Sequence, residues 1–314
     1  MIMPNPVTWP DGKDFAFTIF DDTDLQTVEN AREVYAFLAD MGLRTTKSVW
    51  PLRGGLRPKI GGMTCEDAAY LQWVLSLQEQ GFEVALHNVT YHTSPRPVTV
   101  QGIEQFHHLF GHYPFSMANH VGCYEGIYWG NSRLTGLHEA LYNVLLRYRK
   151  TNVFQGHIEN SSLFWGDICK EHIQYVRNFI FGEINTLSIC PFMPYHDPKR
   201  PYVNYWFASS EGADINSFLS MIAEKNQDRL AAEGGACIMY THLARGFYAG
   251  GQLHSGFKSL MERLSRMNGW FVPVRNLLDY LLEIRGHHDI TDPERRRLER
   301  RWLKHKIMGT GGTT

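Results

Sequence analysis

Short apolar segments and amphipathic segments alternate along almost the whole chain. Residues 15–20, FAFTIF, form an apolar run rich in aromatic residues, which is typical of a buried strand. Residues 25–41 carry apolar side chains at steps of three and four, which predicts one apolar helix face, and Gly42 is expected to end that helix. A chain that repeats this alternation folds around a mainly parallel sheet, which is either open or closed into a barrel.

The same patterns predict the later elements. Further strands are expected at residues 45–52, 82–88, 113–120 and 236–243, and further helices at residues 64–81, 100–111, 135–148, 165–179, 215–235 and 257–269. A last strand and helix are expected within residues 270–285. The 314 residues suffice for a single α/β barrel, so we expect one domain over residues 1–290 and a separate tail over residues 291–314.

Charge and cysteine content exclude several classes of protein. The formal net charge is -1, so nothing indicates a nucleic-acid partner. The 5 cysteines are scattered without a CxxC pair, which argues against a disulfide framework or a cysteine-rich zinc site. The first residues lack the basic start and apolar run of a signal peptide, and no apolar run reaches the length of a membrane span. We therefore expect a soluble, cytoplasmic protein.

The tail differs in composition from the rest of the chain. Residues 293–307 are strongly basic, with Leu298, Trp302 and Ile307 as apolar residues of a predicted helix. A basic amphipathic helix can lie on an anionic membrane at its inner face, or it can pack on the barrel as a solvated helix. Both alternatives remain open from the sequence.

The first predicted strand ends in several carboxylates, in the sequence DDTD. Asp24 is expected to cap the helix that starts at Leu25, but capping needs only one Asp. Asp21 and Asp22 are adjacent, so on an extended strand end their side chains point in opposite directions. One can bind a metal ion while the other faces a substrate, and a cation would relieve their mutual repulsion.

Histidines follow three later strands, where ligands sit in parallel α/β folds. His87 ends the strand at residues 82–88 and His92 follows in the next loop; two imidazoles and a carboxylate leave one position open for water, as in catalytic zinc sites. His242 follows the apolar run ACIMY and suits a general acid. Asn119 and His120 occupy a similar position after residues 113–118.

These motifs resemble those of the polysaccharide deacetylases, also called the NodB-homology or carbohydrate esterase family 4 fold. FTIFDDTD resembles the family's T-F-D-D-G motif, EVALHNVTYH its strand with two histidines, YTHLARGF its late strand with a histidine, and GWFVPVRNLLDYL its closing strand and helix. The resemblance covers about residues 14–282. It implies a distorted (β/α) barrel of seven strands.

The resemblance also implies roles for single residues. Asp21 matches the family's catalytic base, Asp22 and His87 match metal ligands, and His242 matches the histidine that protonates the leaving group. The metal in the family is a divalent ion, usually zinc.

Three departures from the family motifs affect the site. The two histidines of the second motif are five residues apart here instead of four, so either His92 or His120 completes the metal site. Thr23 replaces the usual Gly, and residues 112–120 lack the Arg that pairs with the base in the family. Trp129 and Trp206 are candidate sugar-stacking residues beside Asn119 and His120, with core packing as the alternative.

The resemblance therefore predicts a metal-dependent hydrolase that removes an N-acetyl group from an amino sugar in a cytoplasmic glycan or glycan precursor. The missing Arg leaves room for a deformylase or a cyclic-amide hydrolase on the same fold. A third alternative is a catalytically inactive carbohydrate-binding protein, which the unusual histidine spacing favours.

Overall fold

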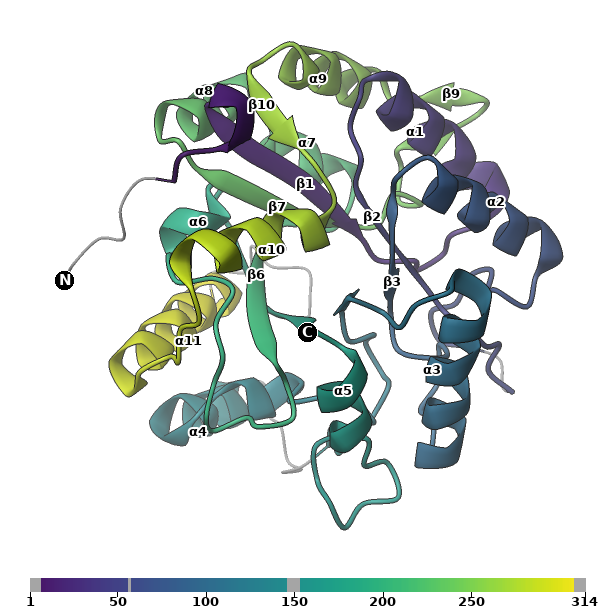
Figure 1. The fold of residues 1–314 in the computed structure, drawn as a ribbon, viewed down its shortest axis with the longest axis vertical. Helices are drawn as coiled ribbons and strands as arrows, with labels where there is room; N and C mark the ends of the chain where they lie inside the picture. Colours follow the sequence, from purple (N-terminus) through teal and green to yellow (C-terminus); the bar gives the residue numbers. More distant parts are fainter. Residues whose placement is uncertain (1–6, 56–57, 146–152, 308–314) are drawn as a thin grey trace.

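The computed structural model of the protein, which describes residues 7–55, 58–145 and 153–307, contains a closed barrel of seven parallel strands surrounded by helices (Figure 1). The strands are β1 (Phe15–Asp21), β2 (Thr46–Val49), β3 (Glu83–Leu86), β4 (Ser116–Met117), β5 (Tyr175–Phe181), β6 (Tyr205–Gly212) and β7 (Ala236–Thr241). They pair in chain order, and β1 also pairs with β7, which closes the barrel. This confirms the α/β barrel that the sequence predicted.

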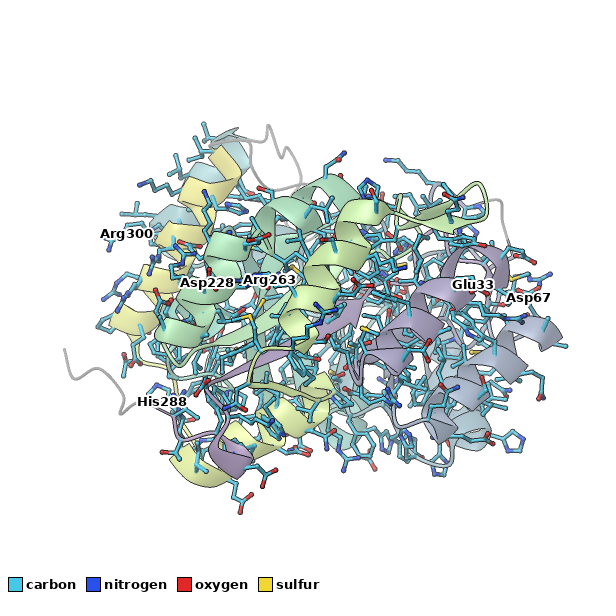
Figure 2. All side chains as sticks on the ribbon, turned by 90° about the horizontal axis from the view of Figure 1, so that it is seen from above. Glu33, Asp67, Asp228, Arg263, His288 and Arg300 are labelled. Atoms are coloured by element: carbon cyan, nitrogen blue, oxygen red, sulfur yellow. The ribbon has the colours of Figure 1, made fainter. Side chains whose placement is uncertain are left out.

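The helices lie outside the strands. They are α1 (Val28–Asp40), α2 (Ala68–Glu79), α3 (Arg96–Phe110), α4 (Gly136–Leu145), α5 (Gly166–His172), α6 (Thr186–Ile189), α7 (Ile215–Met221), α8 (Glu224–Ala232), α9 (Ser255–Ser265), α10 (Val274–Arg285) and α11 (Asp292–Ile307). A short strand, β10 (Gly269–Phe271), pairs with the first half of β1, and β8 (Tyr248–Ala249) and β9 (Gln252–Leu253) form a small hairpin. Asp228 of α8 and Arg263 of α9 form an ion pair on the outer surface (Figure 2).

The first helix begins later than the sequence predicted. Its N-cap is Thr27, which accepts a hydrogen bond from the backbone N–H of Asn30, and the Asn30 side chain accepts one from the N–H of Thr27. The expectation that Asp24 caps a helix starting at Leu25 was wrong. Leu25 instead has φ 61°, a left-handed conformation that excludes it from a regular helix.

Two predicted helices are divided in the structure. Residues 165–179 form the short helix α5 and then β5, because the aromatic and β-branched residues after His172 pair in the barrel. Residues 215–235 break between α7 and α8. There the side chains of Asn226 and Gln227 donate hydrogen bonds to the carbonyls of Met221 and Ile222, at 2.9 Å each, and so satisfy the end of α7.

The basic helix α11 packs on the barrel beside α4 (Figure 1). Trp302 is fully buried, with its ring centroid 5.6 Å from Phe179 of β5 and 5.5 Å from Tyr142 of α4. Leu298 is buried as well, whereas Ile307 is exposed. Within the described ranges, no helix combines the length and apolar character that a membrane crossing requires.

Side chains of β1 alternate between the barrel interior and the helix layer. Phe20 contacts Phe207 of β6, with ring centroids 5.9 Å apart, and Arg177 of β5 lies 5.1 Å from the Phe20 ring. These strands are not neighbours of β1, so their side chains can meet only inside the barrel. Asp21 faces the other way, because its carboxylate accepts a hydrogen bond from Tyr35 of α1 at 2.7 Å.

Candidate active site

Three side chains with metal-binding atoms meet at the carboxyl ends of the strands. Asp24 follows β1, His87 follows β3 and His120 follows β4. Oδ1 of Asp24 lies 3.0 Å from Nδ1 of His120 and 3.3 Å from Nε2 of His87, and these two nitrogens are 3.2 Å apart. All three residues are buried. We call them the Asp24 cluster.

Backbone contacts orient both histidines of the cluster. Nδ1 of His87 lies 3.1 Å from the carbonyl oxygen of Ala118, so this nitrogen carries a proton and the other ring nitrogen, Nε2, faces Asp24. Asn88 adopts φ 55° and accepts a hydrogen bond from the backbone N–H of His120 at 2.7 Å. An Asn tolerates this conformation better than most residues do, and its side chain here joins the loops after β3 and β4.

Asp24 is ionised despite its burial. Burial by itself would raise the pKa of Asp24, but the side chains of His120, His242 and His87, all within hydrogen-bonding reach, outweigh burial and hold the pKa well below its ordinary value. Burial lowers the pKa of His120, more than the neighbouring Asp24 raises it, so its imidazole tends to be neutral. A carboxylate beside two imidazoles is a donor set that suits a divalent transition metal.

The geometry of the Asp24 cluster also fits such an ion. Oδ1 of Asp24 is buried, and no residue in the described part of the chain donates a well-directed hydrogen bond to it. Ligand atoms on a tetrahedral zinc ion, about 2.0–2.1 Å from the metal, are separated from one another by roughly 3.3 Å. The three separations of 3.0, 3.2 and 3.3 Å are close to that spacing.

His242 lies on the other side of Asp24. Its Nε2 is 3.1 Å from Oδ2 of Asp24, and its Nδ1 is 2.7 Å from the carbonyl oxygen of Ala213. Burial opposes protonation of His242, but the contact with Asp24 prevails and raises its pKa. The side chain is therefore suited to hold a proton beside the cluster.

Asp22 also faces the barrel interior, and Arg177 of β5 binds it. The guanidinium donates two hydrogen bonds to the two carboxylate oxygens, at 2.8 and 2.5 Å, and both residues are buried. Oδ2 of Asp22 is 3.9 Å from Nε2 of His87, so Asp22 lies at the edge of the Asp24 cluster. Residues 112–120 hold no Arg, and the guanidinium that pairs with a carboxylate at the end of β1 comes from β5 instead.

Asp21 lies behind the strand, away from the cluster. Its Oδ2 accepts hydrogen bonds from Gln26 and Tyr35, both at 2.7 Å, and its Oδ1 accepts one from the backbone N–H of Leu243 at 2.8 Å. Burial raises the pKa of Asp21, although the neighbouring Lys47 lowers it. Burial in turn lowers the pKa of Lys47 to about 8. These contacts connect the loop after β1 to the loop after β7.

The other predicted site residues are placed as follows. His92 is outside the Asp24 cluster and packs against Tyr91, with ring centroids 4.8 Å apart. Both polar atoms of the Asn119 amide bond to the backbone of Ile127, at 3.2 and 2.8 Å. The guanidinium carbon of Arg133 lies 3.2 Å from the ring centroid of Trp129. Trp206 precedes Phe207 in β6, and because Phe207 faces the barrel interior, Trp206 faces the helix layer.

Asp24 and Arg177 are the site residues that the sequence analysis missed. Asp24 stands two residues after Asp22, and in an extended chain residues i and i+2 share a face, so the DDTD motif did hold the signal. An Arg inside the apolar run YVRNFIF was a second signal, because a buried charge needs a partner. The assignment of that run to a helix concealed it.

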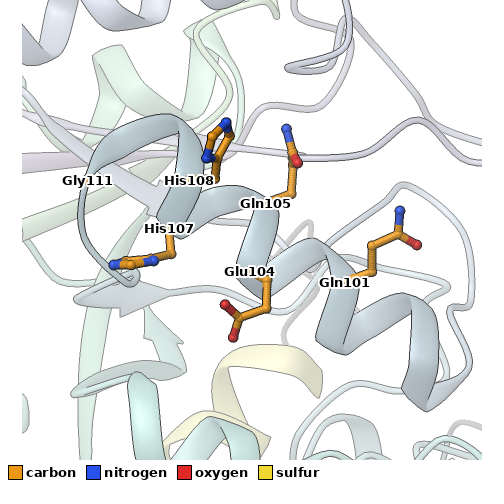
Figure 3. Close-up of a pocket in the computed structure, with 6 residues that line it drawn as sticks. All are labelled: Gln101, Glu104, Gln105, His107, His108 and Gly111. Carbon is orange, nitrogen blue, oxygen red and sulfur yellow. The ribbon is translucent and has the colours of Figure 1, made fainter.

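The Asp24 cluster is covered in this conformation. Trp50, which follows β2 and is fully buried, has its ring centroid 5.9 Å from His87 and 5.2 Å from His120. A surface hollow of about 660 Å³ lies elsewhere, along the outer side of α3 (Figure 3). His107 and His108 contribute to that hollow and are exposed.

Comparison with known proteins supports the fold. No protein-family model matches the sequence, and no curated protein matches it. A protein from Mycobacterium smegmatis that is assigned as a polysaccharide deacetylase superimposes with a TM-score of 0.51 at 10% identity, over 93% of this chain and 99% of that one. Puue allantoinase superimposes with a TM-score of 0.51 at 10% identity, over 90% of this chain and 95% of that one. The chain therefore has the polysaccharide-deacetylase fold that its motifs predicted.

Proposed function

We propose that the protein is a metal-dependent hydrolase of carbon–nitrogen bonds in non-peptide amides. The observation that carries this proposal is the Asp24 cluster, which offers three metal ligands beside the Arg177-bound Asp22 at the carboxyl ends of the strands. That is where parallel barrels hold their reactive groups. A divalent ion bound by Asp24, His87 and His120, most simply zinc, would polarise the amide carbonyl and lower the pKa of a water molecule.

The side chains around the cluster supply the proton transfers. Asp22 faces the cluster and is the carboxylate best placed to take a proton from the attacking water, with Arg177 fixing its orientation. Asp21, the base implied by the family resemblance, points toward α1 and has both oxygens hydrogen-bonded. His242 holds a proton near the cluster and would donate it to the departing amine.

The leading substrate class is an N-acetylated amino sugar. The family resemblance supports it, and the fold is shared with a protein assigned as a polysaccharide deacetylase. Within this class, a cytoplasmic glycan precursor such as a nucleotide sugar or a lipid-linked glycan is our first choice. Contact of the basic helix with a membrane surface stays a prediction, although its Trp302 and Leu298 are occupied by packing.

A cyclic amide is the second candidate substrate. The residues of the candidate site are at most 3% exposed, and such a covered site suits a small substrate better than a polymer. These residues are Asp22, Asp24, His87, His120 and His242. Puue allantoinase, whose name denotes an enzyme acting on allantoin, superimposes on this chain with a TM-score of 0.51, as the protein assigned as a polysaccharide deacetylase does. A formamide is a third small amide that such a site could accept.

The substrate classes can be separated with zinc-loaded protein. Acetate release from UDP-N-acetylglucosamine, formate release from an N-formylated amino sugar and ring opening of allantoin would each be followed, with Asp24→Asn as the control. We expect turnover of one class and none in the variant. Sugar binding without turnover of any class, in protein that binds no zinc, would favour the carbohydrate-binding alternative and contradict the hydrolase proposal.

A further inference from the structure

A second group of metal-binding side chains lies at the opposite end of the barrel. Oδ1 of Asp289 is 2.7 Å from Nδ1 of His196 and 2.8 Å from Nε2 of His287, and the three ligand atoms lie within 4.8 Å of one another. His287 also contacts Tyr205, the first residue of β6. The group therefore lies at the amino ends of the strands, whereas the Asp24 cluster lies at their carboxyl ends.

The backbone holds these side chains on one face. His196 and Asp289 are directly opposite in a parallel β-bridge. The bridge is formed by hydrogen bonds from the N–H of His196 to the carbonyl of His288 and from the N–H of Ile290 to the carbonyl of His196, at 2.9 and 2.8 Å. His287 and Asp289 are two residues apart in an extended segment, so their side chains project to the same side.

Buried ion pairs next to the bridge keep the two segments together. Asp197, which follows His196, accepts two hydrogen bonds from Arg295 of α11, at 2.6 and 2.9 Å, and also pairs with Arg200. All three residues are buried. A metal ion would thus meet ligands whose backbones are already in place, which lowers the entropic cost of binding.

The environment of the group is open to solvent. Nδ1 of His287 lies 3.2 Å from the hydroxyl of Tyr205, which can accept a hydrogen bond from Nδ1–H when Nε2 binds a metal ion. The side chains of His196, His287 and Asp289 are 22%, 53% and 56% exposed, so solvent can reach them and water can fill further coordination positions. His288 is turned away and contacts Glu294 instead, at 3.1 Å.

We propose that His196, His287 and Asp289 bind a second divalent transition-metal ion, of which zinc suits the two imidazoles and the carboxylate best. The simpler alternative is a surface ion pair between Asp289 and protonated histidines. A bound ion would tie the connection between α10 and α11 to the loop before β6. This site does not depend on the proposed hydrolase function.

The test uses the full chain with Asp24→Asn and His120→Ala, which remove the Asp24 cluster. The metal-depleted variant would be titrated with zinc by calorimetry, and bound zinc would be counted by mass spectrometry after gel filtration. We expect about one ion per chain. Adding His287→Ala should weaken this binding by about tenfold or more, since a ligand is lost. The control His108→Ala, an exposed histidine on α3, should leave it unchanged.

Asp289→Asn provides a second, independent variant and should weaken zinc binding in the same way. If the first variant chain does not fold, the wild-type chain answers the question: it should bind one zinc ion more than the His287→Ala variant does. Equal zinc binding with and without His287→Ala would overturn the proposal, as would a chain without the Asp24 cluster that binds no zinc.

Discussion

Asp21 and Asp22 are neighbours in the chain but serve opposite sides of β1. Asp22 points into the barrel and pairs with Arg177, while Asp21 points toward α1 and accepts hydrogen bonds from Tyr35 and Gln26. The alternation of side chains along a strand therefore separates a carboxylate beside the proposed metal site from one that holds the surrounding loops.

Substitution of each Asp by Asn should separate these roles. Asp22→Asn should lower kcat by roughly 10²–10⁴-fold, the usual contribution of a general base, with zinc content unchanged. Asp21→Asn should leave kcat within a few-fold but lower the free energy of unfolding by about 1–3 kcal/mol, because it disturbs buried hydrogen bonds. Steady-state kinetics and urea unfolding measure the two effects.

The reverse outcome would restore the assignment that the family resemblance implies. If Asp21→Asn abolished turnover at unchanged stability while Asp22→Asn remained active, Asp21 would be the base. Glu33→Gln is a suitable control, because Glu33 is an exposed carboxylate on α1 and should affect neither quantity strongly.

Glu125 is a second buried carboxylate near the site, with a different electrostatic character. Burial raises its pKa from 4.5 to about 7, against the lowering effect of its hydrogen bonds, which include one from Asn88 at 3.2 Å. The folded protein therefore keeps this proton up to about pH 7, whereas the unfolded chain releases it near pH 4.5. Between these values the folded state binds more protons, so stability falls as the pH rises.

Glu125→Gln should remove this pH dependence. From pH 4.5 to pH 7 the wild type should lose about 3 kcal/mol of unfolding free energy through this group, and the variant should not. Urea unfolding of metal-free protein at several pH values measures the difference. Glu104→Gln, at an exposed position on α3, is the control. A constant difference in stability between Glu125→Gln and wild type over this range would contradict the assignment.

At the scale of elements, α11 is held to the barrel by its apolar residues and buried ion pairs. Trp302 packs between β5 and α4, and Glu299 accepts hydrogen bonds from Thr135 and lies 2.8 Å from Nδ1 of His138. Arg300 projects from the outer side of the helix (Figure 2). The helix therefore uses its apolar face internally and presents positive charge outward.

Trp302→Ala should lower the free energy of unfolding by about 3–5 kcal/mol, because it leaves a cavity between β5 and α4. Arg300→Ala should change it by less than about 0.5 kcal/mol, as is usual for exposed positions. Urea denaturation compares the two variants. A small effect of Trp302→Ala would mean that α11 contributes little to folding and that its apolar face is available for another surface.

At the scale of the whole molecule, the Asp24 cluster joins three separate βα loops. Its ligands follow β1, β3 and β4, so an ion bound there would connect about half of the barrel circumference. An ion that binds only the folded state stabilises it by mass action, by about 4 kcal/mol at a thousandfold excess over Kd. Metal content and global stability should therefore be linked.

Chelation of zinc should lower Tm by several degrees in the His287→Ala background, which lacks the second proposed site, and added zinc should restore it. The same treatment should leave the Tm of the double variant, His287→Ala with Asp24→Asn, unchanged. Calorimetric scans with and without chelator measure both. An equal response of the two proteins to chelation would show that the Asp24 cluster does not hold the ion.

Sequence patterns were sufficient for a mainly parallel sheet surrounded by helices and for several residues of the candidate site, and the resemblance to the deacetylases added the closed barrel. Apolar runs and helical periodicity depend on neighbours in the chain, and they predicted strands such as β1 and helices such as α10. His87, His120 and His242 could be identified because each follows a strand end. The prediction failed at residues 165–179, where pairing with β4 and β6 makes a strand of a segment whose local pattern resembled a helix.

Which residues share a site depended on contacts between distant parts of the chain. Asp24 resembled a helix cap in sequence, and it joins the histidines because Leu25 turns the chain away from a helix and Thr27 caps α1 instead. Arg177 reaches Asp22 across the barrel interior, 155 residues away in the chain. Local sequence encodes the periodicity of each element, but the partner of a buried charge is set by the closure of the barrel, which no local pattern contains.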